Sequence, residues 1–320
     1  MNFDLNDEQQ EIRTTARSLL AVRGNELDWK ELCELGWPGI AVAEKDGGLG
    51  LGLVELAILA EELGRACGGA PFLGSVLASL VIGKAGSESQ REHWLPQLVG
   101  GEMLGALAIR NEPSLIPDAA PGRLLVLANG DGTAELFPGG PVEAVDAVDL
   151  RRRHGLFDDP GGEGDHLDVD PGAAIAAAMV VVAAELVGLC RRALEATVAY
   201  VRDRRQFDVP IGSFQAVQHT AAQMLRDTEA AAIATYYAAW IGDNRSDGFE
   251  TAASMAKALA SDAGRSVTAS AIQLHGGIGF TWEEDLHWLF KRAQVGAIYL
   301  GGSGAHRAGV ARRLAASASK

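Results

Sequence analysis

The chain has 320 residues, of which 48% are hydrophobic, and a formal net charge of −14 at pH 7. This length can bury a substantial core and predicts two or three domains. The acidic charge and the scattered Lys and Arg residues argue against nucleic acid as the main partner, because phosphate backbones attract clustered basic side chains. Cys33, Cys67 and Cys190 are widely spaced in apolar segments, which favours free thiols in the cytoplasm over a disulfide framework.

The first residues, "MNFDLNDEQQEIRTTARSLL", are charged and helix-like, so no signal peptide is expected there. The most apolar run, "AAIAAAMVVVAAELVGLC" at 173–190, approaches the length of a membrane span. It consists largely of Ala and Val and continues without a break into a charged segment. We therefore expect a buried helix of a soluble bundle and no membrane contact.

Helical patterns divided by short turns predict a helical N-terminal domain over residues 1–102. Asp4 or Asn6 can cap a helix that runs to Leu20, and a second helix is expected near 29–35. The segment "LVELAILAEELGRAC" repeats apolar residues at three- and four-residue spacings, as an amphipathic helix does. The segment "SESQREHWLPQLVGG" has a serine cap, a helical body and a Gly-Gly stop.

Residues 103–171 have the composition of strands and turns. The runs "MLGALAIR", "RLLVLANGDG" and "TAELFP" are short and apolar, and Gly, Pro, Asn and Asp separate them. The pattern continues through "PGGPVEAVDAVDL" and "RRRHGLFDDPGGEGDHLDV", where it ends as a polar loop. These residues predict a short β-type middle domain.

Residues 172–320 predict a C-terminal helical bundle. Long helices are expected at about 172–203, 213–242, 250–274 and 283–295, with a short terminal helix after Gly304. Long helices joined by short turns pack as antiparallel neighbours. The fold class is therefore mainly α with a small β middle domain, and a βαβ nucleotide-binding fold is not expected.

Two segments of the bundle have the chemistry of a ligand site. In "RDRRQFDVPIGSFQAVQH" a basic cluster precedes a turn, and Ser213 is expected to cap the next helix. Arginines beside free helix amides suit an anion, although Arg near a helix C-terminus also compensates the helix dipole. In "QLHGGIGFTWEEDLHWLFKRA" the carboxamide of Gln273 precedes Gly276, Gly277 and Gly279. Such a glycine break can hold a polar ligand edge against bare backbone.

Other polar residues of the bundle suggest structural roles. His219, His275 and His287 have no metal-ligand spacing supported by carboxylates, so no metal is expected. Ser303 has no His-Asp pair that would make it a nucleophile. The segment "WEEDLHW" is interpreted as an acidic helix start favoured by the dipole. Three aromatic residues are interpreted as packing residues: Trp282, Trp288 and Phe290.

The two ligand-site segments resemble the C-terminal domain of the acyl-CoA dehydrogenase family, with an Arg-x-x-Phe turn, "FQAVQH", "QLHGGIG" and "KRA" in the same order. "LNDEQQEIRTTARSLLA", "LGWPGIAVAEKDGGLGLGLVELAILAEELGRA" and "SESQREHWLPQLVGGEMLGALAI" are similar to its N-terminal domain. The resemblance covers nearly the whole chain except about 113–170. It implies an FAD flavoprotein that removes an α proton and a β hydride from an acyl-CoA and passes electrons to an electron-transfer flavoprotein.

The resemblance also implies cofactor contacts. In the family, the Arg-x-x-Phe turn with its Gln and the Gln-x-x-Gly-Gly segment contact the FAD of a neighbouring subunit. The matching residues here are Arg204, Arg205, Gln206, Phe207, Phe214, Gln215, Gln273, Gly276 and Gly277, and Gly302 and Ser303 are expected to pass near a flavin. Asp208 stands where the family usually has Gly, which weakens the expectation of a close backbone approach at that turn.

The middle domain departs from the family pattern. A typical member carries Thr-Glu-Pro and Gly-Ser-Asp segments and a Lys-containing strand with Thr or Ser beside the flavin ring. Only "RNEP" at 110–113 is similar to the first of these. The resemblance therefore implies an incomplete isoalloxazine pocket.

The catalytic base of the family is also missing. The family usually reads Tyr-Glu-Gly-Thr-Ser where this chain reads "YLGGS", so Leu300 occupies the position of the catalytic Glu. Some members carry the base on the long helix instead, at a position near Ala178 here. Glu185, two turns away, is a weak candidate base. A structural pairing with Arg191, Arg192 or another subunit is the favoured interpretation of Glu185.

These departures imply a division of labour between subunits. The chain resembles the small subunit of a heteromeric, α2β2 acyl-CoA dehydrogenase, whose full-length partner would supply the base and the isoalloxazine pocket. Such heteromers in the family are associated with steroid side-chain CoA thioesters in actinobacteria. Two alternatives remain open: a homo-oligomeric dehydrogenase that uses Glu185 or another base, and a non-catalytic helical scaffold without flavin.

Overall fold

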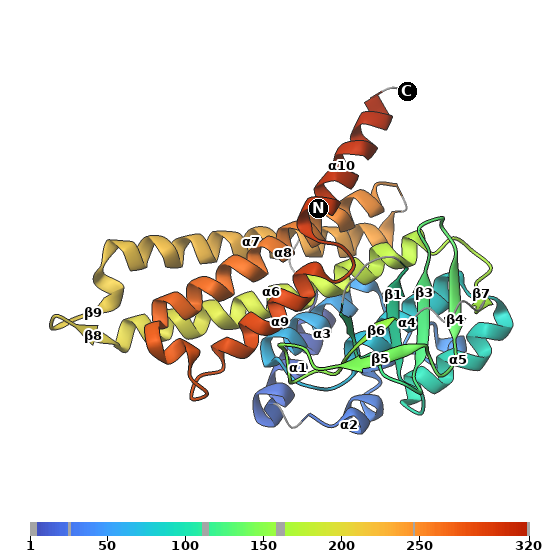
Figure 1. Ribbon diagram of the computed structural model, residues 1–320, viewed down its shortest axis with the longest axis horizontal. Helices are drawn as coiled ribbons and strands as arrows, with labels where there is room; N and C mark the ends of the chain where they lie inside the picture. The colour runs from blue at the N-terminus through green and yellow to red at the C-terminus, as the bar shows by residue number, and fades with distance from the viewer. Residues whose placement is uncertain (1–4, 25–26, 111–114, 158–163, 246, 319–320) are drawn as a thin grey trace.

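The computed structural model describes residues 5–24, 27–110, 115–157, 164–245 and 247–318, and Figure 1 shows their arrangement. Helices and strands from the first half of the chain lie together, and a bundle of long helices extends away from them (Figure 1). The helices of the N-terminal part are α1 (Asp7–Arg23), α2 (Trp29–Glu34), α3 (Leu53–Ala66), α4 (Phe72–Ala85) and α5 (Glu88–Gly100). The predicted mainly α fold with a small β region is confirmed.

Local capping explains where the N-terminal helices begin. The Asn6 side chain accepts a hydrogen bond from the Gln9 amide at 2.8 Å, and the Gln9 side chain accepts one from the Asn6 amide at 3.1 Å. This capping box satisfies two otherwise open amides of α1, while the alternative cap Asp4 lies outside the described residues. Ser87 caps α5 in the same way, and Gly101 ends α5 in the left-handed conformation.

The strands form two small sheets. One sheet has the order β1 (Gly105–Ile109), β3 (Leu124–Ala128), β4 (Ala134–Phe137) and β7 (Asp165–His166), with β1 parallel to β3 and the other pairs antiparallel. The other is antiparallel and has the order β2 (Ile116–Pro117), β6 (His154–Phe157) and β5 (Val142–Val145). Val126 packs into the main core, whereas its neighbours Leu125 and Leu127 pack between the sheets. The central strands read as continuous apolar runs because both faces are covered.

The bundle consists of α6 (Gly172–Asp203), α7 (Gln215–Asn244), α8 (Phe249–His275), α9 (Leu286–Ile298) and α10 (Ser303–Ala318). Among the described residues, α6 alone is long and apolar enough to span a membrane, but 83% of its most apolar window is buried inside the protein. It packs against α3, α7 and α8. This packing accounts for its apolar composition as a core helix.

Helices α3 and α6 cross at two glycines. A Cβ added to Gly64 would lie 2.2 Å from the Glu185 carbonyl oxygen, and one added to Gly188 would lie 1.9 Å from the Glu61 carbonyl oxygen. Neither distance is compatible with a side chain, so the two backbones touch at this crossing. The contact buries the carboxylates beside it, because Glu61, Glu62 and Glu185 are each at most 3% exposed.

The predicted domain boundaries fall between elements. Residue 102 lies between α5 and β1, and residue 171 directly precedes α6. The main hydrophobic cluster nevertheless draws on all three parts, for example through Leu59, Val126 and Leu186. The three-domain division therefore stays a prediction, and the parts share one core.

Several local expectations need correction. Ser213 does not cap α7: it lies in the short helix η4 (Ile211–Ser213) and donates to the Pro210 carbonyl, so Phe214 is the N-cap residue. Trp282 is 73% exposed and is not a core residue. The acidic residues around Glu284 lie in the turn before α9 rather than in its first helical turn. The three cysteines are free thiols, as expected.

Candidate functional site

A two-residue hairpin joins α6 to α7 and carries strained backbone. Strands β8 (Arg205–Gln206) and β9 (Val209–Pro210) pair antiparallel around Phe207 and Asp208, whose φ angles are 52° and 65°. Such tight turns need two left-handed residues, which Asp tolerates and a bulky residue such as Phe adopts rarely. Phe207 is also 87% exposed. A strained and exposed aromatic residue is typical of a functional site.

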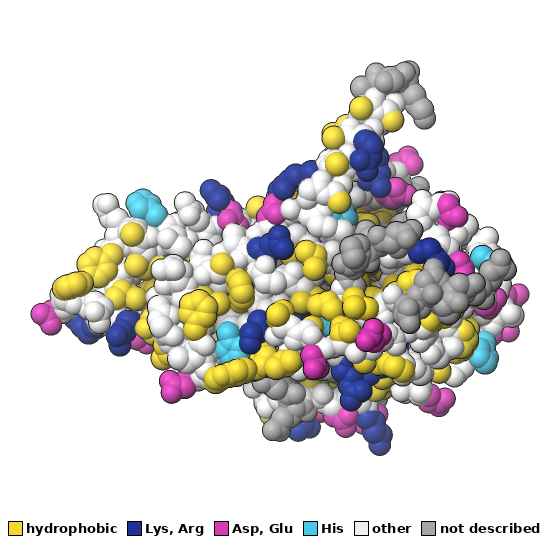
Figure 2. Space-filling view, in the orientation of Figure 1, with side chains coloured by type: hydrophobic (Ala, Val, Ile, Leu, Met, Phe, Trp, Pro, Cys, Tyr) yellow, Lys and Arg dark blue, Asp and Glu magenta, His cyan; other side chains and the backbone are white. Residues whose placement is uncertain are grey.

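The hairpin lies beside the turn that follows α8. The Tyr200 ring stacks on the His275 ring with centroids 4.2 Å apart, and this contact joins the end of α6 to the end of α8. Hydrophobic side chains are visible at this end of the bundle (Figure 2). Nine predicted cofactor residues lie exposed here: Arg204, Arg205, Gln206, Phe207, Phe214, Gln215, Gln273, Gly276 and Gly277. We call this end of the bundle the flavin-contact end.

The flavin-contact end can receive an anionic, planar ligand. No hydrogen bond or ion pair holds the Arg204 side chain within the described part of the chain. The N-cap residue of α7, Phe214, provides no side-chain hydrogen bond, so the first amides and the positive dipole end of a 30-residue helix stay open. No heavy atom lies within 4 Å of a Cβ built on Gly276 or Gly277. These groups fit the phosphates and adenine of a dinucleotide.

The remaining two predicted cofactor residues lie elsewhere. Lys257 on α8 donates to the Ser261 hydroxyl at 2.9 Å and to the Gly301 carbonyl at 3.1 Å, so Gly302 and Ser303 lie near the middle of α8. Ser261 precedes Gln273 by twelve residues, which is ~18 Å along a helix. The predicted cofactor residues therefore divide into two separate sets.

The turn that contains Leu300 is held by side-chain hydrogen bonds and buries the Leu300 side chain. Leu300 is 1% exposed, has a φ of 56° and belongs to the main hydrophobic cluster. Its carbonyl lies 2.9 Å from His306 Nε2, and the hydroxyl of Tyr299 donates to the Leu107 carbonyl at 2.7 Å. The turn is thus tied to α10 and β1, and Leu300 places a buried hydrocarbon side chain there.

Glu185 forms a buried ion-pair cluster. Arg152 binds both of its carboxylate oxygens, one of them at 3.1 Å from Nη1, and Arg292 Nη1 lies 3.7 Å away. Burial alone would raise the pKa of Glu185, but the two guanidinium groups lower it overall. The expectation of a structural ion pair agrees with this geometry. The expected partners were wrong, because Arg191 pairs with Glu61 and Glu229 instead.

The surroundings of Glu185 leave no room for a substrate. The cavity that it lines has a volume of about 10 Å³, which is at the lower limit for one water molecule. Ala178, seven residues earlier on the same face of α6, is fully buried. In the described residues, neither Leu300 nor Ala178 supplies a carboxylate at the position where the family carries its base.

His154 is a buried histidine at the start of β6. It is 3% exposed, and neither ring nitrogen has a hydrogen-bond partner among the described residues. Burial and the nearby charge of Arg152 lower its pKa to about 4. The folded protein therefore keeps this imidazole neutral at pH values where the unfolded chain protonates it.

We expect the stability of the protein to fall by about 3 kcal/mol as the pH drops from 6.5 to about 4, because the unfolded state binds a proton at His154 that the folded state does not. The variant His154→Leu should show a flatter profile over the same range. Urea unfolding at several pH values measures this dependence. Parallel profiles for both proteins would show that other groups control it.

Three further histidines occupy different surroundings. His219 is exposed, His275 stacks on Tyr200, and His287 contacts the rings of Trp282 and Trp288. No group of three His, Cys, Asp or Glu side chains is placed to hold a metal ion among the residues that the structure describes.

Family models match both helical parts of the chain. Residues 173–315 match the acyl-CoA dehydrogenase C-terminal domain, and residues 6–102 match the acyl-CoA dehydrogenase N-terminal domain. The chain belongs to the acyl-CoA dehydrogenase family. It is therefore an FAD-dependent oxidoreductase of the class that acts on CH–CH bonds.

Individual relatives agree with this family. The acyl-CoA dehydrogenase IpdE2 of Mycobacterium tuberculosis is 36% identical, over 91% of this chain and 92% of its own length. A solved structure named as the Tcur3481-Tcur3483 steroid ACAD G363A variant is similar with a TM-score of 0.86 and 26% identity, over 98% of this chain and 99% of that chain. The ChsE4-ChsE5 complex of Mycobacterium tuberculosis has the same fold, with a TM-score of 0.82 and 22% identity over 98% of this chain and 99% of that chain.

Sequence reasoning missed some exposed and buried residues of the site. Phe280, at the end of the glycine turn, is 74% exposed and adds an aromatic surface to the flavin-contact end. Arg152 and Arg292 were not connected with Glu185, because they lie 33 and 107 residues away along the chain. For Phe280, the one local signal in the sequence was the aromatic content of "GGIGFTW".

Proposed function

We propose that this member of the family is a base-lacking small subunit that completes the FAD site of a full-length acyl-CoA dehydrogenase partner. The observation that carries the proposal is the buried Leu300 at the position of the family's catalytic Glu. An intact and exposed flavin-contact end accompanies this loss. A chain that keeps the cofactor contacts and lacks the base needs a second subunit for proton abstraction.

Glu185 is a poor substitute for the missing base. Both of its oxygens are held by Arg152, and its pKa is lowered, which weakens its ability to take a proton. A base must also come within hydrogen-bond reach of the substrate carbon, and the 10 Å³ cavity beside Glu185 prevents this. These observations favour the heteromeric assembly over a homo-oligomer that uses Glu185.

The cavity between the middle region and α6 supports a shared flavin site. Its volume is about 250 Å³. The described residues of the middle region contribute no Ser or Thr to its lining, which they form with Ile109, Ala128, Asn129, Gly130, Gly132, Asp170 and Pro171. The family places Thr or Ser beside the flavin ring. We infer that the partner provides the ring pocket and that Arg204, Gln215 and the Gln273 turn of this chain hold the ADP half.

In this family the bound FAD accepts the hydride. The residues of this chain would bind and orient the FAD. Guanidinium groups with helix amides hold phosphates, and the rings of Phe207 and Phe214 give an apolar surface beside them. The proton would leave to a carboxylate of the partner. This chain would thus contribute cofactor affinity and geometry rather than acid–base chemistry.

The names of two relatives support a substrate class and an assembly. One is described as a steroid ACAD and another as a ChsE4-ChsE5 complex. We infer an α2β2 tetramer in the cytoplasm that desaturates a steroid side-chain CoA thioester. We also infer that it passes electrons to an electron-transfer flavoprotein.

Expression with and without the partner tests the proposal. We expect colourless, inactive protein from the chain alone, and yellow, active protein when it is produced with the partner subunit encoded beside it. In that complex Arg204→Ala should lower FAD affinity by about tenfold or more, because a charge-assisted contact is lost. The exposed Arg265→Ala on α8 is the matched control and should retain FAD.

Other outcomes identify the alternatives. A yellow, active protein without any partner would support the homo-oligomeric dehydrogenase. A protein that stays colourless with every encoded neighbour would support the flavin-free scaffold. Unchanged FAD retention in Arg204→Ala would contradict the shared site.

A further inference from the structure

A second polar cavity lies away from the flavin-contact end. Its volume is about 300 Å³, and it is formed where α1, α3, α6 and the start of α9 meet the connection between β5 and β6. Arg192, which lines it, precedes Arg204 by twelve residues, or ~18 Å along α6. The cavity is therefore distinct from the proposed FAD contacts.

Four arginines from four different elements converge on this cavity. They are Arg17 of α1, Arg65 of α3, Arg151 of the β5–β6 connection and Arg192 of α6. Two carboxylates, Glu62 and Asp285, also line it. The lining carries an excess of two positive charges, which Glu195, paired with Arg65 beside it, reduces to one, in a chain whose net charge is −14. A local positive potential of this kind attracts anions.

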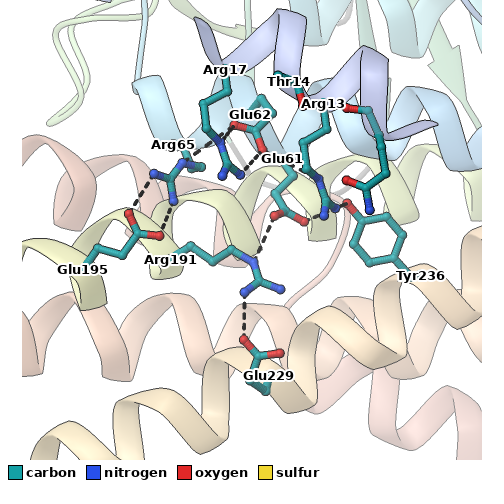
Figure 3. A network of polar contacts seen from close by, with 11 residues as sticks. Arg13, Thr14, Arg17, Glu61, Glu62, Arg65, Arg191, Glu195, Glu229 and Tyr236 are labelled. Carbon is teal, nitrogen blue, oxygen red and sulfur yellow. Dashed lines mark hydrogen bonds and ion pairs between the residues drawn. The ribbon is translucent and has the colours of Figure 1, made fainter. Parts of the chain in front are cut away.

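Ion pairs hold two of these arginines in place, as Figure 3 shows. Arg17 donates to the two oxygens of Glu62 at 2.9 and 2.6 Å, and Arg65 donates to the two oxygens of Glu195 at 2.6 and 2.7 Å. Bidentate pairs fix the direction of a guanidinium group. The wall of the cavity is therefore ordered before any ligand binds, which lowers the entropic cost of binding.

A deeper layer of the same network supports this wall. Glu61 accepts from the Tyr236 hydroxyl at 2.8 Å and pairs with Arg191 at 2.9 Å, and Arg191 pairs with Glu229 at 2.7 Å (Figure 3). These contacts join α3, α6 and α7 behind the arginines. Of the carboxylates in the network, Glu61 and Glu62 are buried, whereas Glu195 and Glu229 lie at the surface.

Arg192 differs from the other three arginines. It is exposed, and no ion pair engages it within the described ranges of the chain. Arg151 is paired with Asp285 at 2.6 Å and also lies over the Trp288 ring. Arg192 is therefore the cation best able to bind an added anion without the loss of an existing contact.

Part of the cavity lining is apolar. Leu20, Ala21, Ala66 and Leu289 contribute to it. Its volume lies at the lower end of the range for small-molecule sites, ~300–1,000 Å³. A lone inorganic ion would leave this apolar surface unused. An organic molecule with an anionic head and a compact body matches both surfaces.

We propose that this cavity binds a small organic phosphate. The phosphate contacts Arg192 together with Arg17 and Arg151, whose forked donors match its oxygens. The organic body packs against Leu20 and Leu289. Because the lining residues come from the N-terminal helices, the middle region and the bundle, a bound ligand would also fasten these parts together. This site is independent of the proposed flavin function.

Calorimetric titration with AMP tests the site on the full chain, in the assembly in which it purifies, at low ionic strength. We expect AMP to bind and uncharged adenosine not to bind. Arg192→Ala should weaken AMP binding at least tenfold. Arg265→Ala is the matched control, because it removes an exposed arginine of α8 that lines neither this cavity nor the flavin-contact end, and it should bind AMP as the unmodified chain does.

Four outcomes would overturn the proposal. These are the absence of AMP binding, equal binding of adenosine and AMP, and equal binding of inorganic phosphate and AMP. The fourth is a loss of AMP binding in Arg204→Ala with full binding in Arg192→Ala, which would place AMP at the flavin-contact end. None of these results bears on the co-expression test of the shared FAD site, so the two proposals can fail separately.

Discussion

Replacement of Gly188 by alanine is expected to destabilise the protein by about 3 kcal/mol or more. The added methyl group would lie 1.9 Å from the Glu61 carbonyl oxygen and 2.8 Å from the Arg65 amide nitrogen. Both atoms belong to the backbone of α3, so no side-chain rotation relieves the overlap and the helices must separate. Separation would also open the ion pairs that flank the crossing. Thermal and urea unfolding measure the loss.

Gly83→Ala is the matched control. Gly83 also lies inside a helix, α4, but the nearest atom to its added Cβ is Leu95 Cδ1 at 4.0 Å. Alanine stabilises an open helical position relative to glycine by roughly 0.5–1 kcal/mol. If Gly188→Ala unfolds at the same urea concentration as Gly83→Ala, the α3–α6 contact is not as close as described.

Glu185→Gln is expected to lower stability by about 3 kcal/mol, because it removes the carboxylate that binds the buried Arg152 through both oxygens, whereas Arg292 keeps its ion pair with Asp149. Glu195→Gln is the control for a lost carboxylate, since Glu195 pairs with Arg65 at the surface and its loss should cost ~1 kcal/mol or less. Urea unfolding of the two variants compares a buried with an exposed ion pair.

The same variant separates the structural role of Glu185 from a catalytic one. Under the shared-site proposal, the remaining folded complex keeps its kcat per bound flavin, because the partner supplies the base. If Glu185 were the base, kcat would fall by a factor of about 10²–10⁴. A folded, flavin-loaded and inactive Glu185→Gln complex would therefore show that Glu185 is the catalytic base.

Local sequence signals were sufficient for most helices. Helix α6 begins and ends at the predicted residues 172 and 203, because Pro171 precedes it and a charged turn follows it. The capping box of Asn6 likewise involves only four consecutive residues, so the local sequence is sufficient to predict it. The sequence of helix α4 shows no clear helical periodicity of apolar residues. All but two of its residues are buried, so the helix has no polar face to alternate with an apolar one.

Long-range contacts could not be predicted from the local sequence. The partners of Glu185 come from the middle region and from α9, and nothing near Glu185 in the chain indicates them. The same limit applies to the arginine-lined cavity, whose four arginines are spread from residue 17 to residue 192. The motifs at the flavin-contact end were recognisable because each one is contiguous, although only the fold brings Tyr200 onto His275.

The exposed aromatic side chains of the α6–α7 hairpin and of the turn between α8 and α9 have a consequence for the cell. Phe207, Phe280 and Trp282 are 87%, 74% and 73% exposed, and such surfaces promote aggregation when they are left uncovered. Under the shared-site proposal, copies of the chain made in excess of the partner subunit would be substrates of chaperones and proteases. The amounts of the two polypeptides must then be matched during synthesis, so that each new chain is covered soon after it folds.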